Sequence, residues 1–242
     1  EHRHGRTAGA VNPKAGLAVC IGRGYRDQPV FTDLCRAVRL CIQRALRLRV
    51  RVAQHELHLA LQRCETLMLQ SKVQFVLSHA HPKAQGALDA EPYRSAQIGE
   101  DRLIPVSAPD ANGQARFRVD RASRSAVAVL EYAQESGLGR IMRAVLGQPL
   151  ESVAAEVVLT AHLASVLRTM ALDGRGIAWL PRTLVHEDIE ARRLVLAASE
   201  EWSVPLDIRL YRDNAALGAA AEAFWDCAVR VLPGRPPTPR AA

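Results

Sequence analysis

The sequence lacks a long apolar segment and an export signal. No run of eighteen apolar residues, the length that would suggest a membrane-spanning helix, occurs among its 242 residues. The first thirty residues contain neither the apolar stretch nor the small-residue cleavage site of a secretory signal. Neither membrane insertion nor export is expected, and the sequence predicts a cytoplasmic protein.

The common catalytic motifs are also missing. The sequence contains no G-x-S-x-G turn, no Walker phosphate loop, no H-E-x-x-H and no C-x-x-C pair. Gly22-Arg23-Gly24 is too short to be a dinucleotide-binding fingerprint. With 48% apolar and 24% charged residues, the chain can still bury a substantial core. The sequence therefore predicts a folded domain that is not an enzyme and needs no cofactor or resident metal.

Cysteine is sparse, and its distribution does not suggest a disulfide framework. The five cysteines are odd in number, scattered, and mostly placed within apolar-periodic segments. We therefore expect buried, reduced thiols, which agrees with a cytoplasmic protein. The five are Cys20, Cys35, Cys41, Cys64 and Cys227.

The net charge of +7 resembles a nucleic-acid signature until it is divided along the chain. Residues 1–54 carry eleven Lys and Arg against three Asp and Glu, whereas residues 55–242 carry 21 against 22. This excess of positive charge in residues 1–54 has two interpretations. It is compatible with the solvated face of a helix and the following strand, or with a phosphate-binding surface. Only Tyr25 and Phe31 lie nearby to stack on bases, so basic charge alone does not predict a nucleic-acid binder.

Hydrophobic periodicity predicts two blocks of alternating strands and helices, which is typical of a largely parallel α/β sheet. A turn over 108–114 (APDANGQ) separates them. The first block is predicted as strand 17–22, helix 31–46, strand 47–53, helix 55–70, strand 72–78, a loop over 79–95 and strand 102–108. The second is predicted as strand 126–132, helix 135–147, strand 153–160, helix 161–174, strand 175–181, a helical or turn segment 183–191, strand pattern at 194–197 and 204–212, and helix 215–232.

An ordered set of motifs then points to a family. The runs are FVLSHAHP, LDAEPYRSAQIGEDRLIPVSAPD, YAQESGLGRIMRAVL, TAHLASVLRTMALDGRGIAWLPRTLV and WSVPLDIRLYR. Together they resemble the effector-binding domain of LysR-type transcriptional regulators over about residues 17–232, and MALDGRGIAWLP followed by PLDIRLYR is the most specific part. The similarity looks nearest to the hypochlorite-responsive branch.

The resemblance implies a type II periplasmic-binding-protein fold, with two α/β lobes joined by two crossover strands. Lobe I would be residues 17–107 plus 211–232, and lobe II residues 108–210. It also implies a small-molecule effector in the inter-lobe cleft, self-association as a homodimer or tetramer, and DNA binding through an N-terminal winged helix-turn-helix. Residues 1–16 match neither that domain nor its linker helix and are interpreted as an extension, and 233–242 as a disordered tail.

Candidate effector contacts follow from strand ends and from the resemblance. Ser136 and Gly137 precede a helix whose N-terminus would favour an anion, although Ser136 is equally typical of an ordinary N-cap. Thr160 occupies the corresponding turn one unit later, with the same two interpretations. The full set of predicted contacts is Ser78, His79, Ser107, Ser136, Gly137, Thr160 and His162.

Two further hypotheses remain open. His79 and His81 form a His-x-His pair of the kind found in metal sites, but no third ligand is evident unless His162 joins from the other lobe. Met170 is by default a core residue, and the resemblance to the oxidant-responsive branch makes it a candidate redox switch. The alternative functions are a solute-binding protein of the same fold and a metal-assisted enzyme.

Overall fold

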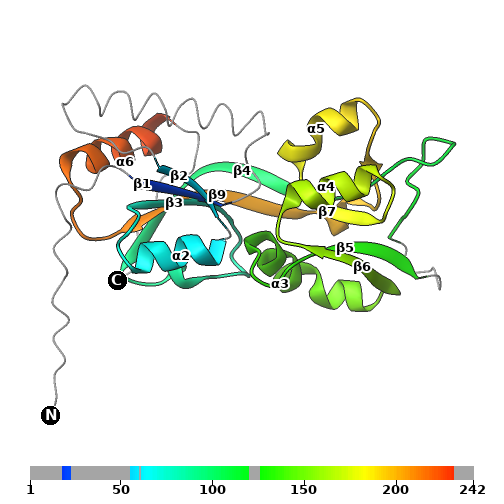
Figure 1. Ribbon diagram of the computed structural model, residues 1–242, viewed down its shortest axis with the longest axis horizontal. Helices are drawn as coiled ribbons and strands as arrows, with labels where there is room; N and C mark the ends of the chain where they lie inside the picture. The colour runs from blue at the N-terminus through cyan, green and yellow to red at the C-terminus, as the bar shows by residue number, and fades with distance from the viewer. Residues whose placement is uncertain (1–17, 23–54, 60, 120–125, 232–242) are drawn as a thin grey trace, which may run out of the picture.

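The computed structural model describes residues 18–22, 55–59, 61–119 and 126–231. Figure 1 shows two groups of elements side by side, which we call lobe I and lobe II. Lobe I contains strands β1 (Ala18–Gly22), β2 (His55–Leu59) and β3 (Phe75–Ala80), with helices α2 (Leu61–Leu69) and α6 (Ala219–Val231). Lobe II contains β5 (Val127–Tyr132), β6 (Ala155–Ala161) and β7 (Ile177–Pro181), with α3 (Gly137–Glu151), α4 (Ala164–Leu172) and α5 (Arg182–Glu190).

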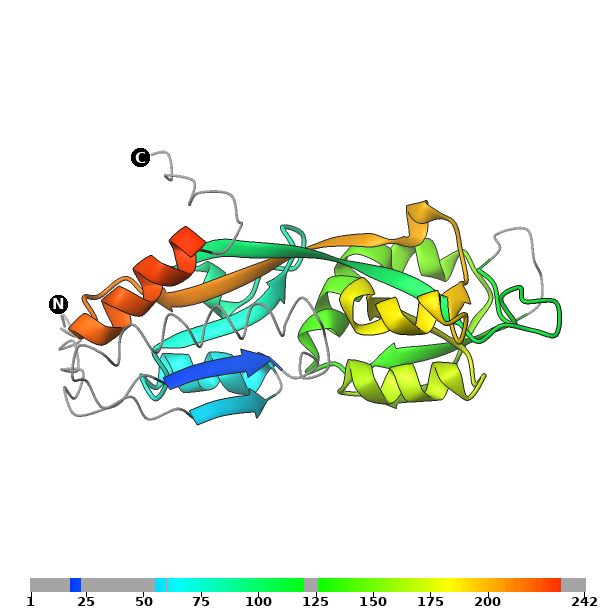
Figure 2. The same cartoon turned by 90° about the horizontal axis from the view of Figure 1, so that it is seen from above.

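Two long antiparallel strands connect the lobes. In Figure 2, β4 (Tyr93–Ser107) and β9 (Val204–Asp213) run side by side from one lobe to the other. The strand order β2-β1-β3-β9-β4-β7-β5-β6 places these two strands in the middle, with parallel strands on both sides. The short strand β8 (Val195–Leu196) pairs with the end of β4, and single 3₁₀ turns occur at Ala87–Asp89 and Glu200–Trp202. The predicted α/β architecture with two crossover strands is confirmed.

Alternation along β3 explains how lobe I is covered on both faces. Phe75 and Leu77 pack into a cluster with α6, whereas Val76 and Ala80 pack into a cluster with α2. Because side chains alternate along a strand, the two helices must cover opposite faces of the sheet. β3 is accordingly buried throughout, as its continuous apolar run predicts for a strand covered on both sides.

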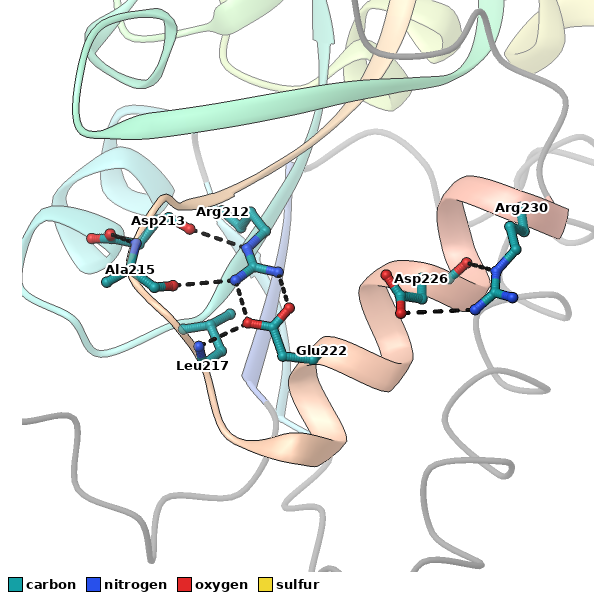
Figure 3. A network of polar contacts seen from close by, with 7 residues as sticks. All are labelled: Arg212, Asp213, Ala215, Leu217, Glu222, Asp226 and Arg230. Atoms are coloured by element: carbon teal, nitrogen blue, oxygen red, sulfur yellow. Dashed lines mark hydrogen bonds and ion pairs between the residues drawn. The ribbon is translucent and has the colours of Figure 1, made fainter.

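A buried arginine fixes α6 to lobe I. Arg212 of β9 is fully buried, and its Nη1 and Nη2 donate to Glu222 Oε2 and Oε1 at 2.6 and 2.7 Å. The same guanidinium donates from Nε to the Asp213 carbonyl and from Nη2 to the Ala215 carbonyl, so all three of its nitrogens are hydrogen-bonded (Figure 3). It also stacks 5.4 Å from the ring centroid of Trp225 on the next turn of α6.

Several predicted element boundaries are wrong in lobe I. The helix expected over 55–70 begins at Leu61, because 55–59 forms the strand β2, which pairs in parallel with β1. The loop expected from 79 to 95 is shorter at both ends: β3 continues to Ala80, and β4 begins at Tyr93. The first half of β4 has one partly exposed face that carries polar residues, and such residues are also typical of a loop. The predicted helix 31–46 and strand 47–53 lie outside the described residues.

The predictions for lobe II agree with the structure within a few residues. Strand, helix, strand, helix and strand follow in the expected order from β5 to β7. The turn over 108–114 is present, where Asp110 Oδ1 accepts hydrogen bonds from the backbone N–H groups of Asn112 and Gln114. Gly113 has a φ of +77°, a conformation that favours glycine.

The prediction of reduced thiols is wrong for two cysteines. Cys64 on α2 and Cys227 on α6 are both disulfide-bonded. The odd number and apolar surroundings of the cysteines do not show which thiols meet after folding. Within the described residues, no helix is long and apolar enough to cross a membrane.

Candidate functional site

The first turns of α2 and α3 meet between the two lobes. A Cβ atom at Gly137, the first residue of α3, would lie 2.5 Å from Leu61 Cδ2 at the start of α2. Glycine therefore permits the close approach of the two helices. The carboxyl end of β3 also reaches this place, which is where ligands bind between open α/β lobes.

The described residues of the two lobes enclose a small cavity here. Its volume is about 10 Å³, which has room for no more than one water-sized occupant. Its walls come from α2, β3 and α3, from the loop after β3, and from β9. The polar residues around it are Glu65, Ser78, His79, Asp89, Arg140 and Tyr211.

An ion pair joins the lobes at this cavity. Arg140 Nη2 on α3 donates to Glu65 Oε1 on α2 at 3.1 Å. The Nε–H of Arg140 is buried and has no hydrogen-bond partner among the described residues. Gly86 lies directly against the pair, since a Cβ atom there would be 2.6 Å from both Arg140 Nη2 and Glu65 Oε1. A buried donor without an acceptor is costly, so Arg140 is suited to receive an additional anionic or carbonyl oxygen.

A second buried network connects the cleft to the crossover strands. His79 Nε2 lies 3.4 Å from Asp101 Oδ2, and the two side chains are 5% and 1% exposed. Asp101 also accepts hydrogen bonds from the Thr183 hydroxyl at 2.6 Å and from the backbone N–H of Arg102 at 2.7 Å. Burial alone would raise the pKa of the Asp101 carboxyl, but the hydrogen bond and charge of His79 and the donors of Thr183 and Arg102 outweigh it and lower the pKa.

We expect Asp101→Asn to lower the free energy of unfolding by about 2–4 kcal/mol. The carboxylate accepts from donors on both oxygens, whereas an asparagine must direct its NH₂ group at one of them. Urea denaturation of the variant measures the loss. Asp110→Asn is the matched control, because Asp110 lies in an exposed turn that asparagine also suits, and it should change stability by less than about 0.5 kcal/mol. An equal effect of the two substitutions would contradict a structural role for the Asp101 network.

Four of the predicted contacts lie at the inter-lobe cavity or beside it. Ser78 and His79 line the cavity and are 5% and 7% exposed. Ser136 is buried at the start of α3, where its Oγ accepts a 3.4 Å hydrogen bond from the Gly139 N–H as an N-cap. Gly137 follows it and packs on Leu61.

The other predicted contacts lie elsewhere. Ser107 is fully buried at the lobe II end of β4, where its Oγ accepts from the Phe117 N–H at 3.3 Å. Thr160 is exposed near the carboxyl end of β6. His162 follows that strand, and its exposed ring lies 3.5 Å from Glu135. Met170 packs half-buried against the lobe II core, and its redox role stays a prediction.

The two histidines of the His-x-His pair make other contacts in the structure. His81 Nδ1 accepts a hydrogen bond from the Lys83 N–H at 3.1 Å, and His79 faces Asp101. Among the described residues, no group of three or more His, Cys, Asp or Glu side chains could hold a metal ion.

Sequence reasoning missed the two residues of the ion pair. Arg140 lies one turn into α3, where it is half-buried beside Ile141 and Met142 of the apolar core. Glu65 is a buried carboxylate among the apolar residues of α2. A charge on the apolar side of each helix is the signal that could have identified them, although the sequence does not show that the two helices face each other.

Comparison with known proteins decides the family. Residues 34–233 match the family model for the LysR substrate binding domain. The chain belongs to this family. Its membership confirms the resemblance and the periplasmic-binding-protein-like fold, and the LysR family is one of transcriptional regulators rather than enzymes.

Two curated relatives match part of the LysR chain. The HTH-type transcriptional regulator YjiE of Escherichia coli K12 is 30% identical over 134 residues, which are 55% of this chain and 43% of that protein. The HTH domain-truncated transcriptional regulator QseD of E. coli O157:H7 is 30% identical over 134 residues, or 55% of this chain and 54% of that protein. The chain spans about half the length of these relatives.

A solved structure agrees in fold. The apo regulatory domain of HypT from Salmonella typhimurium, a hypochlorite-specific LysR-type regulator, superposes with a TM-score of 0.66 at 20% identity. The match covers 90% of this chain and 95% of that domain. This likeness shows the shared fold, and the placement near the hypochlorite-responsive branch stays a prediction.

Proposed function

We propose that this LysR domain binds a small anionic effector between its lobes and thereby controls transcription through the winged helix-turn-helix that family members carry. The effector would contact Ser78, His79, Ser136 and Gly137, together with Arg140. Lobe I would comprise residues 17–107 plus 211–232, and lobe II residues 108–210. Because it would act on DNA, we propose that the protein is cytoplasmic.

The observation that carries this proposal is Arg140. Its guanidinium comes from lobe II, reaches the cavity at the carboxyl end of β3, and has a buried Nε–H with no acceptor among the described residues. The N-terminus of α3, one turn earlier, adds a favourable potential for negative charge. Because the described residues leave only about 10 Å³ at this position, we propose that an organic effector separates the lobes or displaces Glu65 from Arg140. Binding would in this way change the arrangement of the lobes.

Native mass spectrometry of the purified chain tests the proposal. We expect a dimer or tetramer that retains a small organic acid, whose mass identifies the effector class. The same acid should bind again after it has been removed by unfolding and refolding. A chain that neither retains nor rebinds any anion would contradict the effector-sensing function.

The edge of lobe II is suited to self-association. Strand β6 is the last strand of the sheet, and Val157 and Val158 on it are 51% and 46% exposed. Val166 on the following helix α4 is 39% exposed. An edge strand with exposed apolar side chains readily pairs with another chain. We propose that this edge and α4 of lobe II pack against a second copy.

Replacing Val166 by aspartate should therefore convert the oligomer to a monomer, because a buried charge without a partner is unfavourable in an apolar interface. Sedimentation-velocity measurements report the change. The matched control is Leu69→Asp, since Leu69 is 57% exposed at the end of α2 in lobe I. If the Val166 variant stays oligomeric, the interface lies on another surface.

A further inference from the structure

We propose that a pocket beside the crossover strands binds a second small ligand, a zwitterion of the α-amino-acid class. The pocket lies between β4, β9 and the first turns of α5, and its volume is about 560 Å³. Small-molecule sites commonly occupy about 300–1,000 Å³. The inter-lobe cavity is a separate space lined by other residues, and the Asp101–His79 contact lies between the two.

One part of the pocket is acidic. Glu100 on β4 and Asp207 on β9 are register partners in the antiparallel ladder, so their side chains lie on one face as neighbours. Like charges placed directly opposite on adjacent strands are destabilising. Asp207 accepts from Arg209 at 2.8 Å, whereas Glu100 accepts a hydrogen bond from the Gln97 amide at 3.2 Å and forms no ion pair with the described residues. An ammonium group between Glu100 and Asp207 would remove this repulsion.

Another part of the pocket is basic. Arg102 lies two residues along β4 from Glu100, and therefore on the same face about 7 Å away. Arg182 and His186 are spaced by four residues on α5, so they share a helix face. The Arg182 side chain forms no hydrogen bond or ion pair with any described residue. It also belongs to the first turn of α5, where negative charge is favoured. These groups would receive a carboxylate.

The existing partners of the basic groups are weak competitors. Arg102 pairs with Glu200, but the two side chains are 41% and 83% exposed. His186 pairs with Glu190, which lies on the next turn and is 66% exposed. Exposed pairs of this kind contribute about 0–1 kcal/mol, so a ligand carboxylate can replace them.

The floor between the two charged parts is apolar. Pro205 of β9, the exposed register partner of Arg102, lines the pocket between the two charged parts. A ligand with a carboxylate and no ammonium group would bring a second negative charge near Glu100. A ligand with an ammonium group and no carboxylate would leave the Arg182 side chain without a partner. An α-amino acid with an apolar side chain satisfies the acidic part, the basic part and the floor together.

Ligand-observed NMR with the 242-residue chain and each of the common L-amino acids tests the proposal. We expect binding of at least one amino acid with an apolar side chain, and at least tenfold weaker binding of its deaminated acid and of its carboxamide. Arg182→Ala and Glu100→Gln should each weaken binding about tenfold or more. Both residues are exposed, so the variants should fold, which circular dichroism verifies. Arg230→Ala on α6 is the control and should bind like the wild type.

Three outcomes would overturn the proposal. The first is that no amino acid binds at millimolar concentration. The second is equal binding of the amino acid and its deaminated acid, since the acidic part would then have no role. The third is loss of binding in Arg140→Ala without any change in Arg182→Ala, which would place the amino acid in the inter-lobe cleft.

Discussion

Replacement of Glu222 by glutamine is expected to lower the free energy of unfolding by about 2–3 kcal/mol. Removing one partner of a buried ion pair costs more than the pair contributes, because the remaining charge stays buried. Arg212 is 0% exposed and cannot reach water, and the substitution leaves its charge uncompensated. Because the Glu222 side chain is itself 37% exposed, water can approach the vacated position, and the loss should remain moderate.

The same helix offers a matched control. Asp226 and Arg230 form a second carboxylate–guanidinium pair on α6, and their side chains are 59% and 77% exposed (Figure 3). Asp226→Asn should change the free energy of unfolding by less than about 0.5 kcal/mol. Urea denaturation of the two variants compares a buried guanidinium with an exposed one on the same helix. Equal losses would show that burial of Arg212 is unimportant for the attachment of α6.

The effect of Glu222→Gln should also depend on pH. Hydrogen bonds from Arg212 are the largest influence on Glu222 and lower its pKa to about 2, against an ordinary value of 4.5. A carboxyl with a lowered pKa stabilises the fold above its unfolded-state pKa, and this contribution is lost as the pH falls toward 2. The difference between wild type and variant should therefore be larger at about pH 7 than at about pH 3.5. A difference that does not change with pH would contradict the ionic contribution.

The elements of lobe II could be predicted because local signals agree there. α3 follows a serine that caps it, and β5 and β7 are short apolar runs that the sheet buries. Each signal lies within a few residues of the element that it specifies. The segment 55–59 lacks such a signal, because HELHL fits both a helix start and an edge strand, and only its pairing with β1 decides between them.

The site could be predicted only in part, for a related physical reason. The positions of Ser78 and Ser136 near the cavity could be predicted, because ends of strands and starts of helices are recognisable in sequence. The Glu65–Arg140 pair spans 75 residues of sequence and depends on how two helices from different lobes approach each other. The disulfide bonding of Cys64 and Cys227 likewise depends on distances in the folded chain, which cysteine spacing does not contain.

Two substitutions at the inter-lobe ion pair are expected to change effector affinity in opposite directions. Arg140→Ala should weaken binding of the acid identified by mass spectrometry about tenfold or more, because it removes the charge-assisted hydrogen bonds that a half-buried guanidinium would donate to the acid. Glu65→Gln should strengthen binding, by about tenfold, because Glu65 competes with the acid for the same guanidinium. Isothermal titration calorimetry measures both, with Arg175→Ala, an exposed arginine of lobe II, as the control.

The opposite signs distinguish ligand binding from a purely structural role. If the pair only held the lobes together, both substitutions would break the same 3.1 Å bond and loosen the closed arrangement in the same way. Affinity would then change in one direction for both variants. If Arg140 binds the effector, Arg140→Ala removes the group that binds the acid. Glu65→Gln instead removes the charge of a carboxylate that competes with the acid for Arg140. Binding that requires Glu65 to leave Arg140 is coupled to lobe separation, since Glu65 and Arg140 lie on different lobes. The chain would thereby convert the binding of an acid into a change in how its two lobes are arranged.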